Sequence, residues 1–82
     1  MRVRVKMPKL GLTTEEATIL EWRKHVGEPV AAGEILLVVE TEKTEVEIEA
    51  PATGTVVELV GQVKGVYPIG EVIAVIETVA GA

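Results

Sequence analysis

Apolar and polar residues alternate along several short stretches of the chain, as they do in strands that bury one face. Two such stretches flank a polar turn, with apolar residues at every second position: Ile35, Leu37 and Val39 before it, and Val46, Ile48 and Ala50 after it. Further alternating or apolar runs at 2–6, 17–22, 55–60 and 72–76 are separated by segments rich in Gly and Pro. The pattern predicts an all-β chain of short strands.

The polar turn between the first two stretches predicts a β-hairpin with a lysine at its tip. If Thr41 lies opposite Thr44, a single register buries all six apolar side chains of the two arms. Glu42 and Lys43 then occupy the two central positions of the turn. Two-residue hairpin turns prefer Asn-Gly or Asp-Gly at these positions, so the residues at this tip are unusual.

The same register creates an unfavourable charge pair beside the lysine. Glu40 comes to lie opposite Glu45, and like charges directly across two strands destabilise the pairing. Both the turn residues and the charge pair break local rules at one place. Such departures are expected at functional sites, so the hairpin tip is the candidate site.

An internal repeat appears when the chain is shifted by 37 residues against itself. Residues 17–22 then match 54–59, and 33–40 match 70–77, while Gly27 falls on Lys64 as the one clear mismatch. Two copies are too few for a solenoid, so we expect two sheets related by a pseudo-two-fold axis, each covering the apolar face of the other. Because Lys43 falls on Ala80 at the chain end, the lysine tip and the chain end should lie at opposite poles.

Composition narrows the function classes. The 82 residues make one small domain, and a net charge of −5 argues against nucleic acid or an anionic membrane as a partner. The absence of cysteine excludes disulfides, thiolate metal sites and cysteine nucleophiles. The first residues alternate like a strand and lack the apolar centre of a signal peptide. The single histidine, His25, lies in a polar stretch and is expected at the surface.

The charged residues of the hairpin leave a narrow choice of chemistry. Glu45, Glu47 and Glu49 lie on the outer face of one strand, where paired carboxylates lack the cleft that catalysis or metal binding needs. Nearby carboxylates favour the charged form of Lys43, which argues against a resting nucleophile. A lysine acylated by another enzyme instead needs exposure, a rigid turn and a recognisable surrounding pattern, all of which this tip offers.

Five segments resemble, in order and spacing, the lipoyl domains of 2-oxoacid dehydrogenase acyltransferase components. They are Met7–Thr13, Thr18–Trp22, Gly27–Val30, Glu40–Thr44 and Ala50–Gly54, and the resemblance runs from Arg2 to Glu77. It implies a flattened β-barrel or sandwich of two four-stranded antiparallel sheets, in agreement with the repeat. We expect residues 1–78 to form this domain, and the small residues at 79–82 to begin a flexible linker of a longer protein.

The resemblance also implies a carrier function without catalytic or metal-binding residues. Lys43 would carry lipoic acid as a swinging arm, and a lipoate ligase or lipoyl transferase would recognise Glu40, Glu42, Thr44 and Glu45 around it. The arm would pass between a thiamine-diphosphate-dependent 2-oxoacid decarboxylase, the acyltransferase core and dihydrolipoamide dehydrogenase. The loop residues implied in recognition by the decarboxylase are Lys9, Leu10, Gly11, Leu12 and Thr13. The expected compartment is the prokaryotic cytoplasm, with the mitochondrial matrix as the alternative.

Two other readings stay open. A biotinyl carrier domain shares the hairpin fold, but its lysine normally lies between two methionines, whereas Lys43 lies between Glu42 and Thr44. An unmodified β-barrel that serves only protein contacts is the second alternative. Nothing in the residues selects among pyruvate, 2-oxoglutarate, branched-chain and acetoin-type systems.

Overall fold

The computed structural model describes residues 1–11 and 14–78, and the part of the chain it describes contains strands and no helix. The strands are β1 (Arg2–Lys6), β2 (Glu16–Trp22), β3 (Pro29–Val30), β4 (Ile35–Glu40), β5 (Glu45–Glu49), β6 (Gly54–Leu59), β7 (Val66–Pro68) and β8 (Val72–Glu77). The predicted all-β class is therefore confirmed. The linker expected at 79–82 lies outside the described residues.

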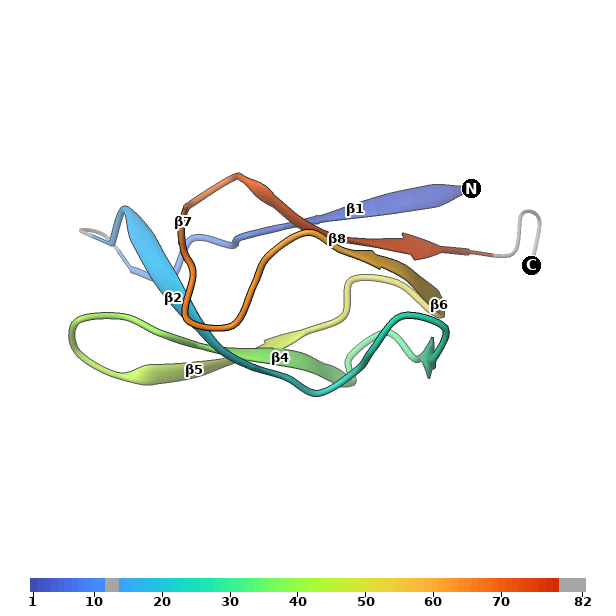
Figure 1. The fold of residues 1–82 in the computed structure, drawn as a ribbon, viewed down its shortest axis with the longest axis horizontal. Coiled ribbons are helices and arrows are strands. Elements are labelled where there is room, and N and C mark those ends of the chain that lie inside the picture. Colours follow the sequence, from blue (N-terminus) through green and yellow to red (C-terminus); the bar gives the residue numbers. More distant parts are fainter. Residues whose placement is uncertain (12–13, 79–82) are drawn as a thin grey trace.

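The strands form two antiparallel sheets of four strands each (Figure 1). One sheet has the order β1-β8-β6-β3 and the other the order β5-β4-β2-β7. Within the described ranges no strand pair joins the two sheets. The fold is thus a flattened sandwich rather than a closed barrel.

The two sheets are copies of each other, as the repeat predicts. The shift of 37 residues places β4 on β8, β2 on β6 and β3 on β7, and β1 and β5 occupy the matching edge positions. At the one position where the residue types differ, the backbone conformation is still the same: φ is 93° at Gly27 and 71° at Lys64. Their amides donate to equivalent carbonyls, those of Val56 (2.7 Å) and Ile19 (2.6 Å). The mismatch therefore does not interrupt the two-fold symmetry.

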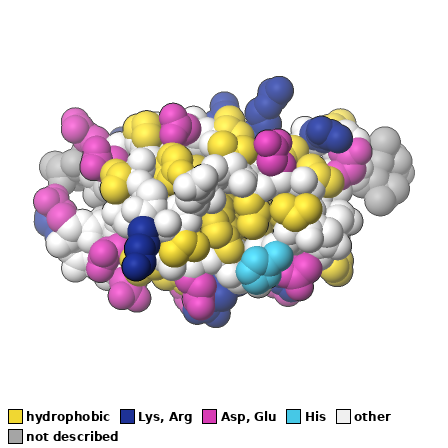
Figure 2. Space-filling model, in the orientation of Figure 1, with side chains coloured by type: hydrophobic (Ala, Val, Ile, Leu, Met, Phe, Trp, Pro, Cys, Tyr) yellow, Lys and Arg dark blue, Asp and Glu magenta, His cyan; other side chains and the backbone are white. Residues whose placement is uncertain are grey.

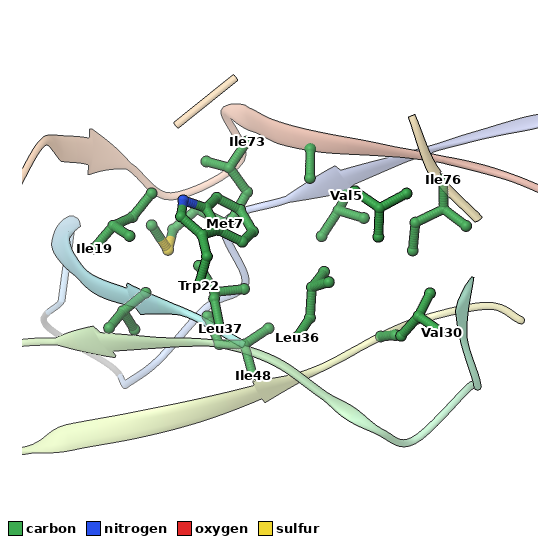
Figure 3. Close-up of a cluster of buried hydrophobic side chains, with 14 of the residues drawn as sticks. Val5, Met7, Ile19, Trp22, Val30, Leu36, Leu37, Ile48, Ile73 and Ile76 are labelled. Carbon is green, nitrogen blue, oxygen red and sulfur yellow. The ribbon is translucent and has the colours of Figure 1, made fainter. Parts of the chain in front are cut away.

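The core fills the space between the sheets (Figure 3). Its largest fully buried side chains are Met7, Ile19, Leu36, Leu37, Ile73, Ile76, Val39 and Val56. Trp22 packs among them, and its indole Nε1 donates to the carbonyl of Gly61 at 3.0 Å. The structure buries no polar or charged residue in the ranges it describes. The burial of apolar area on both inner faces is the main force that holds the two sheets together.

The predicted register of the hairpin is confirmed in its outer half. Val39 lies opposite Val46 and Leu37 opposite Ile48. Of these four side chains, Val46 is half-buried and the other three are buried. Alternation thus identifies the inward face of the hairpin correctly near the tip.

The register is wrong at the base of the hairpin. Ile35 lies opposite Glu49 rather than Ala50, because the pairing shifts between Ile35 and Leu37. This irregularity lets Leu36 and Leu37, which are adjacent in sequence, both be fully buried. Ile35 is therefore only half-buried, although strict alternation places it inside.

The pattern of residues does not predict the two shortest strands. Pro29 lies in a Gly- and Pro-containing segment between the expected strands, but it begins β3 and pairs with Thr55. Likewise Val66 begins β7 and pairs with Thr18. Two or three residues are too few to display alternation, so only the sheet pairing reveals these strands.

Candidate functional site

The hairpin between β4 and β5 lies at one end of the sandwich, and the first residue of the chain lies at the other (Figure 1). In the hairpin, the Thr41 amide donates to the Thr44 carbonyl at 2.8 Å. At the equivalent place in the other half, the Thr78 amide donates to the Met1 carbonyl at 2.7 Å. The lysine turn therefore takes the position that Met1 and Thr78 take in the second sheet, and these two residues lie at the pole opposite the hairpin. Ala80, which the repeat matches to Lys43, lies outside the described residues.

The turn is organised by the hydroxyl of Thr41. Its Oγ1 accepts from the amides of Lys43 at 3.3 Å and Thr44 at 3.2 Å, and it donates to the Thr44 carbonyl at 3.2 Å. Neither Glu42 nor Lys43 has a positive φ, so this is not the type I′ turn for which Asn-Gly is favoured. The apparent conflict between residues and turn type is thereby resolved.

Thr41 is a site residue that sequence reasoning missed. The available signal was a threonine at the first position of a four-residue turn, where a hydroxyl can bond to backbone groups two or three residues further on. These bonds hold the backbone at Lys43 in a defined position. The rigid turn that acylation requires thus comes from a neighbour rather than from the central residues.

The lysine projects into solvent together with the residues that surround it. Lys43, Glu42, Thr44, Glu40 and Glu45 are all exposed. Within the described part of the chain, no carboxylate forms an ion pair with Lys43. The Nζ amine is therefore accessible to an enzyme that modifies it.

The predicted like-charge pair is present, since Glu40 lies directly opposite Glu45. At the equivalent place in the other sheet, Glu77 lies opposite Arg2, with 3.5 Å between Arg2 Nε and Glu77 Oε2. One fold thus carries opposite charges at one pole and like charges at the other. The backbone register therefore does not require two negative charges beside Lys43.

A groove of about 410 Å³ adjoins the hairpin. It is lined by Thr14, Glu15, Glu16, Ala17, Thr18, Glu40, Thr41, Glu42 and Val66. Thr14 and Glu15 end the connection from β1 to β2, so this connection reaches the side of the hairpin tip. The last residues of this connection therefore lie beside the hairpin that carries Lys43.

The loop residues expected to recognise the decarboxylase differ in their exposure. Lys9 and Gly11 are exposed, and Leu10 is half-buried and packs against the core cluster. Leu12 and Thr13 lie outside the described residues. Of the three described positions, Lys9 and Gly11 are therefore the ones whose surface a partner can contact.

The remaining candidates behave as surface residues. Glu45, Glu47 and Glu49 are exposed along β5, and the described residues contain no group of three or more side chains placed to hold a metal ion. His25 is exposed, as predicted, with its Nδ1 at 3.0 Å from Glu28 Oε1. Across the described ranges, no helix is long and apolar enough to cross a membrane.

Residues 3–76 match the biotin and lipoyl family, described as "Biotin-requiring enzyme". The chain belongs to this family. Members of this family carry a covalently attached lipoyl or biotin group, which agrees with an exposed lysine at a hairpin tip. The expectation that the chain belongs to the lipoyl and biotinyl attachment domains is confirmed.

Curated relatives in the family are acyltransferase components. The chain is 44% identical over 72% of its length to the dihydrolipoyllysine-residue acetyltransferase of the Bacillus subtilis acetoin cleaving system. It is 43% identical over 85% of its length to that of the Corynebacterium glutamicum pyruvate dehydrogenase complex. It is 41% identical over 98% of its length to the succinyltransferase of the Cupriavidus necator 2-oxoglutarate dehydrogenase complex. The matches span 15%, 10% and 19% of these proteins, so the chain corresponds to a small part of each.

The fold also matches a solved lipoyl domain. The lipoyl domain of the 2-oxoglutarate dehydrogenase complex from Azotobacter vinelandii superposes with a TM-score of 0.75 and 26% identity. The match covers 93% of this chain and 96% of that domain. The family and fold together identify the chain as a lipoyl domain of the acyltransferase-component type.

Proposed function

We propose that Lys43 carries lipoic acid in amide linkage and that the domain moves acyl groups within a 2-oxoacid dehydrogenase complex. The observation that carries this proposal is the exposed Lys43 on a tip braced by the Thr41 hydroxyl, at the pole opposite Met1. A chain tethered at the Thr78 end would hold the lysine outward. The similarity to acyltransferase components supports lipoic acid as the attached group.

The residues of the tip fit such a group without contributing chemistry of their own. A lipoyl group supplies a dithiolane that accepts an acyl group and two reducing equivalents at the end of a long flexible arm. Lys43 anchors the arm, Thr41 fixes the backbone beneath it, and the exposed glutamates keep the tip solvated. Tethering raises the effective concentration of the arm at each partner.

The partners in this proposal are those that the resemblance to lipoyl domains implies. They are a lipoate ligase or lipoyl transferase, a thiamine-diphosphate-dependent decarboxylase, the acyltransferase core and dihydrolipoamide dehydrogenase. In this scheme the domain is a non-catalytic part of an acyltransferase chain. The prokaryotic cytoplasm remains the predicted compartment.

Biotin is the main alternative to lipoic acid, and two modifying enzymes distinguish them. The chain is coexpressed with a lipoate ligase or with a biotin ligase, and its intact mass is measured. We expect a lipoyl adduct with the first enzyme and no adduct with the second. A biotin adduct would establish the biotinyl alternative, and no adduct with either would favour an unmodified structural domain.

The 2-oxoacid is tested separately, because the relatives act in acetoin, pyruvate and 2-oxoglutarate systems. The lipoylated domain is incubated with the acyl-donating enzyme of each system and its substrate, and the gain of an acyl group is followed by mass spectrometry. We expect rapid acylation by one of these enzymes. Equal rates with all of them would show that the domain itself does not select the complex.

A further inference from the structure

The two sheets end in edge strands of opposite charge. β1 lies at one edge of its sheet beside β8, and β5 lies at the matching edge of the other sheet beside β4. The charged side chains, all exposed, are Arg2, Arg4 and Lys6 on β1 and Glu45, Glu47 and Glu49 on β5. Figure 2 shows Lys and Arg along the upper rim, where Figure 1 draws β1, and Asp and Glu along the lower left rim, where it draws β5. Each strand thus presents a row of three like charges, and the two rows have opposite signs.

The backbone does not determine these signs, because the two sheets have the same arrangement of strands. Charged side chains on an edge strand hinder pairing with the edge of another copy when the charges are alike. Two β1 strands therefore repel each other, and so do two β5 strands. Of the three possible pairings of these edges between copies, only β1 with β5 brings opposite charges together.

Most of these charges have no ionic partner within the domain. In the ranges that the structure describes, the members of the two rows without an ion pair are Arg4, Lys6, Glu45 and Glu49. Arg2 lies 3.5 Å from Glu77, and Glu47 lies 3.9 Å from Arg23. The side chains of Arg2 and Glu47 are nevertheless 69% and 58% exposed. Both rows are therefore accessible to a partner of opposite charge.

One antiparallel register matches the two rows along their whole length. Successive charges are two residues apart in both strands, which is about 6.7 Å in extended backbone. When the central residues Arg4 and Glu47 lie opposite each other, the outer charges match as well. The three pairs are Arg2 with Glu49, Arg4 with Glu47 and Lys6 with Glu45.

The inner sides of the two strands match in the same register. Val5 and Ile48 are buried within their own domain, whereas Val3 and Val46 are only half-buried. The pairing would place Val3 beside Ile48 and Val5 beside Val46, so each half-buried valine would be covered by a buried residue of the neighbour. Because burial of apolar surface is favourable, the inner face favours the same register as the charges.

We propose that β1 of one copy docks antiparallel on β5 of a second copy and joins their sheets edge to edge. The association goes beyond the proposed function and does not require a group on Lys43. Each strand has five residues, so the interface is small and belongs to the weak, transient class. Copies tethered in one assembly reach effective concentrations of about a millimolar, at which such a contact is populated.

Antiparallel docking points the lysines of neighbouring copies in the same direction. β1 begins at the pole of Met1 and runs toward the pole of the hairpin, whereas β5 begins at the hairpin and runs back (Figure 1). The two hairpins therefore come to lie at the same end, whereas parallel docking would place them at opposite ends. The contact joins different surfaces of the two copies, so a row can extend with every Lys43 on one side. This last consequence rests on the proposed function.

Disulfide trapping tests the contact without background, because the chain contains no cysteine. Arg4→Cys and Glu47→Cys are mixed in equal amounts in a glutathione redox buffer, and the dimers are identified by intact mass. Residues directly opposite each other in an antiparallel pair are close enough for a disulfide. Random collision gives as much heterodimer as the two homodimers together. We expect about a fivefold excess of heterodimer from the two ion pairs that remain, and a smaller excess at high salt.

A random ratio of dimers would overturn the docking surface. The direction of the strands is tested with Arg2→Cys, which should form a disulfide with Glu49→Cys in preference to Glu45→Cys. A preference for Glu45→Cys would establish parallel docking and contradict the alignment of the lysines. Circular dichroism establishes that each variant is folded.

Translational diffusion measured by NMR at increasing protein concentration tests the contact without cysteines. We expect diffusion of the wild type to slow with concentration beyond the effect of viscosity. Arg4→Glu and Glu47→Arg should each abolish this slowing, and their equimolar mixture should restore it because each variant retains the edge that the other lacks. Glu58→Arg is the matched control, since it makes the same change of charge as Glu47→Arg at an exposed residue of the inner strand β6.

The control should slow with concentration as the wild type does. A wild type without this slowing, or a Glu47→Arg variant that behaves like Glu58→Arg, would contradict the proposed contact. Neither result bears on the attachment of a lipoyl group to Lys43, so the proposed function is tested separately.

Discussion

Glu40 and Glu45 face each other across the hairpin, at the place where Glu77 and Arg2 form an ion pair in the opposite sheet. The two pairs have the same backbone register and opposite electrostatics. Because one domain contains both arrangements, the effect of each charge can be measured against its symmetric counterpart. The like-charge pair lies beside Lys43. A destabilising pair is expected at a position where the charges serve a function.

Glu45→Arg should stabilise the domain, since it turns the like-charge pair with Glu40 into an opposite-charge pair. We expect the free energy of unfolding to rise by about 0.5 kcal/mol, and Arg2→Glu at the symmetric position to lower it by a similar amount. Urea unfolding at low and high salt measures both changes, which should shrink as salt increases. Changes of the same sign in the two variants would contradict this account.

Thr41→Val should weaken the tip, because valine keeps the branched shape but cannot accept from the amides of Lys43 and Thr44. We expect a loss of about 1 kcal/mol in the free energy of unfolding and slower lipoylation. Thr78→Val is the matched control: its hydroxyl donates to the Met1 carbonyl at 3.1 Å at the other pole. The control should leave the lipoylation rate unchanged, and an equal slowing in both variants would refute a local role for Thr41.

Gly54→Ala should be strongly destabilising, because a Cβ at this position would clash with the carbonyl oxygen of Glu77. That oxygen belongs to the backbone of β8, which pairs with β6 and cannot move away without breaking the sheet. We expect a loss of roughly 2–3 kcal/mol. Its counterpart in the first repeat already carries a Cβ, so Ala17→Gly should cost only about 0.5–1 kcal/mol. Thermal unfolding of the two variants gives the comparison.

Acid should weaken the domain through two carboxylates. The pKa of Glu28 lies below its ordinary value of 4.5 because the His25 amide donates to it, and the Ala31 amide lowers the pKa of Glu34 in the same way. A carboxyl whose pKa is lower in the folded than in the unfolded chain stabilises the fold above the unfolded value. This contribution is lost as the pH falls below about 4.5 and through the folded pKa values.

The measurement is the urea midpoint as a function of pH between 7 and 3. The wild type should lose stability on acidification, and the double variant Glu28→Gln and Glu34→Gln should lose less over the same interval. A double variant with the same pH profile as the wild type would show that these two carboxyls do not contribute.

The fold could be predicted wherever burial alone decides the structure. Val39 and Val46 lie opposite each other because only one register buries both arms of the hairpin. The shift at Ile35 could not be predicted, since nothing in the residues marks the point where Leu36 also turns inward. The repeat predicted the symmetry of the sheets, and Lys64 keeps the left-handed backbone of Gly27 although the two residue types differ.

The site could be predicted in part. Lys43 stands out because of its acidic neighbours, which are adjacent in sequence. Thr41 stabilises the turn through hydrogen bonds, which the pattern of charges in the sequence does not predict. The groove depends on the pairing of Val66 with Thr18, two residues far apart in the chain, so it emerges only when the strands are assembled.

The central claim is that Lys43 is the residue that carries the group, and peptide mapping tests it most directly. The domain is coexpressed with a lipoate ligase, digested with an endoprotease that cleaves after glutamate, and analysed by tandem mass spectrometry. The account predicts a single lipoyl group on Lys43 in the wild type and an unmodified chain for Lys43→Arg. A lipoyl group on Lys6, Lys9, Lys24 or Lys64, or its persistence in Lys43→Arg, would contradict it.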